Sequence, residues 1–173
     1  MITVTIEEIP YNIPSNWNDI SFGKYLAIVN KSMGEIDPIG YLSTVTDIPA
    51  HVIENTPAII VEQLYSVVSF IHEDGLQVYN VYPAELEQIE IKEKPYRHFI
   101  ATSNAVTVHW RELYGDKLEL SEAEVNNVYL HAAVTAVKEY MGLDILTMPI
   151  PSSYGLAVFF CSLFRNLTTN TAS

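Results

Sequence analysis

The sequence has little of the chemistry that marks common enzyme classes and metal sites. A single cysteine, Cys161, excludes an internal disulfide and any zinc site built from several cysteines. The five histidines are scattered, and none forms the HExxH pair of zinc hydrolases. The seven glycines occur singly, so no phosphate-binding glycine loop is present. We therefore expect a protein that is not an enzyme, with no catalytic residues, no cofactor and no metal.

Positive charge is also scarce. The chain has 9 Lys and Arg against 21 Asp and Glu, a net charge of −12. Residues 1–95 hold 14 acidic and 4 basic residues (−10), whereas residues 96–173 hold 7 and 5 (−2). Proteins that bind nucleic acids cluster Lys and Arg against the phosphates, and this chain has no such cluster. We expect no direct nucleic-acid binding; the acidic surface either keeps the chain soluble or steers it toward a basic protein.

Long apolar runs are missing as well. No stretch approaches the roughly 20 apolar residues that span a bilayer. Met1 leads into alternating Thr, Val and Ile residues without the basic and then apolar segments of a signal peptide. We expect no contact with membranes, and a cytoplasmic location.

Apolar residues are plentiful, at 49% of the 173 residues, so the chain can bury a substantial core. Ile2, Val4 and Ile6 alternate with polar residues, which predicts a half-buried strand. Pro10 is expected to break this strand, and residues 11–13 to form a short return strand. Together they predict an N-terminal hairpin.

Four short helices are predicted to follow the hairpin. Ser21 can cap the first, whose inner face is Phe22, Tyr25, Leu26 and Val29. Three further starts are predicted from a cap residue close to a proline, at Asp37-Pro38, Asp47-Ile48-Pro49 and Thr56-Pro57. The last helix presents Ile60, Leu64, Val67 and Ile71, and is expected to stop before Gly75.

The middle of the chain is ambiguous. Residues 76–91 fit extended or irregular structure, residues 92–95 are the best candidate linker, and residues 102–114 fit either a strand or a helix. His72-Glu73-Asp74-Gly75 gathers possible metal ligands, but it lacks the alternating oxygen ligands of a calcium loop. We interpret this segment as the polar end of the preceding helix.

The C-terminal region predicts two long helices. Ser121 and Glu124 have capping-box spacing, and the helix that they open is expected to stop at Gly142. A final helix is expected from about Ser153, with a frayed tail over residues 168–173. The fold class is therefore α+β, mainly helical, with an acidic unit over residues 1–92 and a helix-rich unit over residues 96–173 packed together.

The final helix carries the most prominent apolar stripe in the sequence. A stripe of this kind either packs in the core or forms an exposed docking face for another protein. Cys161 lies among its apolar residues and is expected to act as a small buried hydrophobe. The candidate protein-binding face consists of Leu156, Phe159, Phe160, Leu163, Phe164 and Leu167.

The N-terminal region resembles that of small tailed-bacteriophage proteins. In these proteins a short hairpin leads into the first helix through a pattern of Pro, Trp, acid, apolar, Ser or Thr, apolar and Gly. The matching residues are Pro14, Trp17, Asp19, Ile20, Ser21, Phe22 and Gly23. The stretch from Leu42 to Phe70 is similar to their following helices, so the resemblance covers about residues 1–75.

Proteins with this pattern are described as tail assembly chaperones or as neck and tail accessory proteins. The resemblance implies a non-catalytic protein that binds tape-measure, portal, neck or tail proteins in the host cytoplasm, and it is compatible with a homo-oligomer. One alternative is a permanent virion component, such as a head–tail connector ring or a cargo protein. Another is a small phage-encoded enzyme or host-directed inhibitor, which a cleft joining His98 or His109 to several buried carboxylates would favour.

Overall fold

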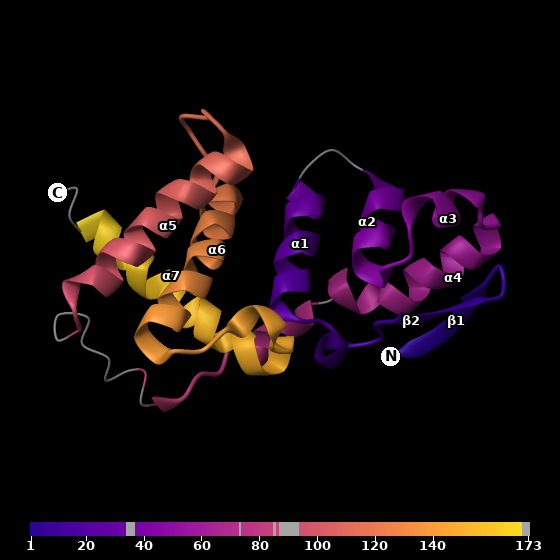
Figure 1. Ribbon diagram of the computed structural model, residues 1–173, viewed down its shortest axis with the longest axis horizontal. Helices are drawn as coiled ribbons and strands as arrows, with labels where there is room; N and C mark the ends of the chain where they lie inside the picture. The colour runs from indigo at the N-terminus through magenta and orange to yellow at the C-terminus, as the bar shows by residue number, and fades with distance from the viewer. Residues whose placement is uncertain (34–36, 73, 85, 87–93, 171–173) are drawn as a thin grey trace.

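The computed structural model describes residues 1–33, 37–72, 74–84, 86 and 94–170. It shows an α+β, mainly helical protein with an N-terminal hairpin, as the sequence predicts. In Figure 1 the hairpin and four short helices form one side of the molecule, and three long helices form the other. The first side comprises β1 (Ile2–Ile6), β2 (Ile9–Ile13), α1 (Phe22–Met33), α2 (Pro38–Thr46), α3 (Ala50–Asn55) and α4 (Ala58–Val68). The second comprises α5 (Tyr96–Tyr114), α6 (Glu122–Met141) and α7 (Ile150–Asn170).

The hairpin closes through a two-residue turn. Glu7 and Glu8 both have positive φ (51° and 67°), as a type I′ turn requires. The strands pair antiparallel from Ile6↔Ile9 to Ile2↔Ile13. Pro10 pairs with Thr5 inside β2, so the expectation that it breaks the strand was wrong. The ring is tolerated because the backbone nitrogen at this position points away from β1.

Two of the four predicted helix starts are confirmed. The hydroxyl of Ser21 accepts a hydrogen bond from the Lys24 N–H (3.2 Å) at the start of α1. The Asp37 carboxylate accepts one from the Gly40 N–H (2.8 Å) at the start of α2. Both side chains satisfy donors that the first turn of a helix leaves unpaired.

The other two starts were assigned to the wrong residue. Asp47 adopts a left-handed conformation that ends α2 (φ 60°), and Pro49 precedes α3 without a side-chain cap. Pro57 likewise precedes α4, while the Thr56 hydroxyl donates back to Val52 O (2.7 Å). Helix α4 ends at Val68, and 3-10 turns follow it over Ser69–His72 and Asp74–Tyr79.

The part of the ambiguous middle that fitted either a strand or a helix forms a helix. Residues 102–114 belong to α5, because tertiary contacts with α6 select the helix over the alternating pattern of a strand. Of the predicted linker, residues 94 and 95 precede α5, and residues 92 and 93 lie outside the described ranges, as do 85 and 87–91.

The two C-terminal helices are confirmed. Ser121 and Glu124 form the capping box of α6, and Gly142 ends it with a positive φ of 71°. The final helix starts at Ile150, earlier than the predicted Ser153, and its helical backbone includes residues 168–170 of the predicted frayed tail. Residues 171–173 lie outside the described ranges. None of the helices that the structure describes has the length and apolar character needed to cross a membrane.

One hydrophobic core extends through both sides of the molecule. It includes Ile13, Phe22 and Leu42 from the N-terminal side and Ala136 and Phe160 from the C-terminal side, all with no exposed surface. A backbone bridge also joins the two sides. The Ile150 N–H donates to Ile20 O and the Phe22 N–H donates to Met148 O, both at 2.9 Å.

Candidate functional site

The predicted face of α7 divides into a buried part and a partly exposed part. Leu156, Phe160 and Phe164 are at most 6% exposed and belong to the core. Phe159, Leu163 and Leu167 are only partly buried. The sequence pattern could not separate the two sets, because both lie at helical spacing on one broad apolar stripe.

Aromatic contacts explain why half of this face is buried. The ring of Phe160 lies 5.6 Å from that of Tyr140 on α6, and the ring of Phe164 lies 5.9 Å from it. Phe99 on α5 stacks on Phe164 at 6.0 Å. These residues hold the three long helices together and are therefore unavailable to a partner protein in the folded state.

Two of the partly exposed residues, Phe159 and Leu163, line a hollow on the surface of α7. Phe159 and Leu163 form its floor with Tyr82, whose ring lies 4.9 Å from that of Phe159. The hollow has a volume of about 290 Å³, and the described residues that line it, which also include Asn80, Ser162 and Asn166, are uncharged. Val78 and Val81, on the segment that carries Tyr82, are 74% and 76% exposed. We call the hollow lined by Tyr82, Phe159 and Leu163 the α7 groove.

Gly155 positions the wall of the α7 groove. A Cβ atom at residue 155 would overlap the carbonyl group of Val81, so the segment that contains Val81 crosses α7 against bare backbone. Only glycine allows an approach this close. The close approach brings Tyr82 over Phe159, and the sequence offers no signal for it beyond the glycine itself.

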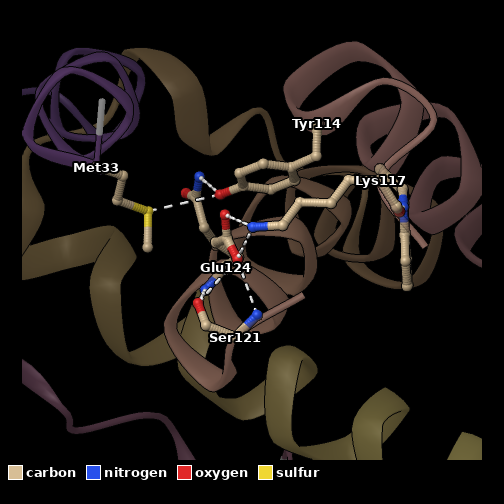
Figure 2. A network of polar contacts seen from close by, with 7 residues as sticks. Met33, Tyr114, Lys117, Ser121 and Glu124 are labelled. Carbon is tan, nitrogen blue, oxygen red and sulfur yellow. Dashed lines mark hydrogen bonds and ion pairs between the residues drawn. The ribbon is translucent and has the colours of Figure 1, made fainter. Parts of the chain in front are cut away.

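A network of polar contacts surrounds the start of α6 (Figure 2). Glu124 accepts hydrogen bonds from the Lys117 ammonium (2.8 Å) and from the backbone N–H of Ser121 (2.8 Å). These donors lower the pKa of Glu124 from 4.5 to about 2, with Lys117 as the largest cause. The carboxylate therefore stays ionised and closes the loop between α5 and α6, which is a structural role.

A second part of the polar region joins α1 to α5 and α6. Asn127, 2% exposed, donates to Asn30 Oδ1 (2.8 Å) and to the Tyr114 hydroxyl (3.0 Å). Tyr114 in turn donates to the sulfur of Met33 at 3.6 Å, and Figure 2 shows its hydroxyl directed at that sulfur. The Oδ1 of Asn127 is buried and has no partner among the described residues. We call the contacts of Asn30, Met33, Tyr114 and Asn127 the polar junction.

His131 extends the polar junction toward α5. Its Nε2 lies 3.3 Å from Asn30 Oδ1, and its ring lies 5.2 Å from that of His109. Burial, with a smaller contribution from His109, lowers the pKa of His131 to about 4. The imidazole is therefore neutral near pH 7 and acts as a hydrogen-bonding partner rather than a charge.

The remaining histidines and the cysteine are dispersed. His98 contacts a single carboxylate, Glu139 (2.7 Å), and His109 contacts Glu112 (3.1 Å). His72 stacks on Tyr41, and the neighbouring Glu73 lies outside the described residues. Within the described ranges, no three His, Cys, Asp or Glu side chains are grouped so as to hold a metal ion.

Cys161 is only partly buried, rather than fully buried as expected. Burial nevertheless raises the pKa of its thiol to about 11. The thiolate is the nucleophilic form of cysteine, so this environment disfavours reactivity.

Comparisons with known proteins provide no relative from which a role could be transferred. No protein-family model matches the chain, and no curated protein and no solved structure matches it either.

Proposed function

We propose that this protein is a non-catalytic bacteriophage assembly protein that acts by binding other proteins at the tail or neck, in the manner of a tail assembly chaperone. The proposal combines the resemblance of residues 1–75 with the α7 groove. It implies action in the host cytoplasm during particle assembly, with no bound cofactor.

The observation that carries the proposal is the composition of the α7 groove. A chain with a net charge of −12 has a hollow here that two aromatic rings line, and none of the described residues around it is charged. At about 290 Å³ it lies just below the range of ligand pockets, which span roughly 300–1,000 Å³. These properties suit apolar side chains of a helical protein segment, such as those of a tape-measure protein, because aromatic pockets of this kind anchor interfaces.

Co-expression with the tape-measure protein of the same phage tests the proposal. We expect a complex that co-elutes in gel filtration and that Phe159→Asp or Leu163→Asp weakens at least tenfold. Val108→Asp is the matched control, because Val108 is an exposed apolar residue (48%) on a different long helix, α5. Loss of the complex in the control as well, or unchanged binding by both groove variants, would contradict a role for the α7 groove.

A permanent virion component is the second candidate. The outer edge of β1, with which no third strand pairs among the described residues, favours it, because open strand edges support assembly of subunits. Mass spectrometry of purified particles separates the two candidates. A chaperone should be absent from mature particles, whereas a connector or cargo protein should be present at a fixed stoichiometry.

A further inference from the structure

The outer edge of β1 carries backbone groups that have no partner in the described part of the chain. Because Ile6 and Ile9 flank a two-residue turn, they form a hydrogen-bonded pair, and the pairing then alternates along the hairpin. Thr3 and Thr5 therefore direct their N–H and C=O groups away from β2. Over the ranges that the structure describes, no other strand pairs with β1 and no backbone hydrogen bond from another element reaches it.

The two edges of the hairpin differ. On β2 the equivalent outward positions are Pro10 and Asn12, and the ring of Pro10 removes one of the two outward donors. Proteins commonly block exposed edges with proline, lysine or a bulge. Residues 2–6 of β1 contain none of these and no charged side chain. The hairpin packs on α2 through β2, which leaves β1 as the outer strand.

We propose that β1 pairs antiparallel with β1 of a second copy of this chain, about a twofold axis at Val4, to form a four-stranded sheet. This inference goes beyond the proposed function and does not use the α7 groove. It concerns the purified protein alone, so it can fail while the proposed function stands.

The register of this pairing is self-complementary. A twofold axis at Val4 places Thr3 opposite Thr5 of the second copy, and Thr5 opposite Thr3. Each of these pairs exchanges two hydrogen bonds, which makes about four in total. A closed interface of this kind uses the same surface on both chains.

Side chains also fit this register. Ile2, 46% exposed in the single chain, comes to lie opposite Ile6 of the second copy. The paired strands bring no like charges together, because β1 is uncharged although the whole chain is acidic. A five-residue edge buries less than the roughly 1,200 Å² of a standard stable interface, so the dimer should be of moderate affinity and should dissociate on dilution.

Two proline variants of the full chain test the proposal. Thr3→Pro removes an outward donor from β1, and Asn12→Pro removes the outward donor directly opposite it on β2. Both lose the same hydrogen bond from the Thr3 hydroxyl to Asn12 Oδ1 (3.0 Å), so the two variants are matched in this side-chain contact within the hairpin. In sedimentation equilibrium from low micromolar to submillimolar concentration, we expect wild type and Asn12→Pro to dimerise alike. Thr3→Pro should dimerise at least tenfold more weakly.

Amide hydrogen exchange in the wild-type protein supplies a test that does not depend on how the variants fold. The N–H groups of Thr3 and Thr5 should become protected as concentration rises, while those of Val4 and Tyr11, which pair inside the hairpin, should stay protected throughout. A wild-type protein that remains monomeric over the whole range would overturn the proposal. So would equal effects of the two proline variants, or exchange at Thr3 and Thr5 that does not change with concentration. A strand from a different protein would then be the remaining occupant of the edge.

Discussion

The two ends of α1 meet the C-terminal side of the molecule with different chemistry. At its start, Phe22 and Tyr25 pack in the core, and the ring of Tyr25 lies 5.8 Å from that of Tyr154 on α7. At its other end, Asn30 and Met33 enter the polar junction. In Figure 1, α1 lies between the other short helices and the three long ones, so one helix makes both kinds of contact.

The two ends of α1 therefore have different roles: one mainly stabilises the contact with the C-terminal side, and the other mainly fixes its orientation. Apolar burial contributes free energy roughly in proportion to area and tolerates small shifts. A buried amide network contributes little net free energy, but it penalises any arrangement that leaves its members unpaired. We infer that the apolar end of α1 supplies most of the stability of the contact, and that the polar junction selects the angle at which α6 lies against α1.

The largest expected effect is at the apolar core. Phe160→Asp places a charge where the side chain has no exposed surface, so we expect a loss of more than about 4 kcal/mol in the free energy of unfolding, enough to unfold the chain. Circular dichroism and urea denaturation measure this. Ser162→Asp, exposed on the same helix, should change stability by less than about 0.5 kcal/mol. A folded Phe160→Asp with a wild-type midpoint would show that this part of α7 is not core.

Gly155→Ala should have the next largest effect. Alanine favours a helix by about 1 kcal/mol over glycine. Here its methyl group overlaps backbone atoms of Val81, so the cost lies at the upper end of the about 1–3 kcal/mol that overpacking causes. We expect a net loss of stability and faster amide exchange over residues 79–84. Gly23→Ala is the matched change, since its Cβ would lie 3.1 Å from Leu146 O and demands a smaller shift. Equal losses in the two variants would count against the close crossing at Gly155.

The polar junction should respond less than the core. Asn127→Ala removes the amide that donates to Asn30 Oδ1 and to the Tyr114 hydroxyl, which should cost about 1–2 kcal/mol in the free energy of unfolding. Urea denaturation measures the loss, with the exposed Asn104→Ala on α5 as control. If Asn127→Ala lost as much stability as a truncation in the core, the proposed division between the two ends of α1 would be wrong.

The smallest expected effect is a dependence on pH. The pKa of His131 is 6.5 in the unfolded chain and about 4 when folded, so between these values the unfolded chain binds a proton that the folded protein does not. The contribution of the neutral imidazole is complete above pH 6.5 and is lost as pH falls toward 4. We expect a loss of about 1 kcal/mol, reduced because the ring is partly hydrated.

The pH series separates His131 from the carboxylates. Urea midpoints between pH 7 and pH 5 should fall in the wild type and in His51→Gln, whose substituted ring is exposed, and should fall less in His131→Gln. Asn30, His109 and Glu112 face the ring of His131, so these groups also contribute to the difference between the wild type and His131→Gln. If the urea midpoint changed equally with pH in all three proteins, His131 would not be a cause of the pH dependence.

Local signals in the sequence predicted local structure well. The hairpin, the caps at Ser21 and Asp37 and the capping box at Ser121 and Glu124 are all confirmed, because each depends on hydrogen bonds within a few residues. The predictions of helix caps at Asp47 and Thr56 were wrong, because a residue with a short polar side chain can also end a helix or bond back to it.

Tertiary contacts decided what the patterns left open. Residues 102–114 alternate like a strand but form a helix, because a long helix can pack along α6. The apolar stripe of α7 could not show which of its residues would meet Tyr140 and Phe99 and which would line a hollow with Tyr82.

The sequence by itself determined the fold class, the hairpin and the starts of α1, α2 and α6, since these follow from periodicity and from bonds between near neighbours. Only the tertiary structure decided which part of α7 stays accessible, where Gly155 admits the crossing segment and how Asn30 meets Asn127 across 97 positions of the chain. Those features depend on residues that are distant in sequence and adjacent in space, and no local pattern encodes that adjacency.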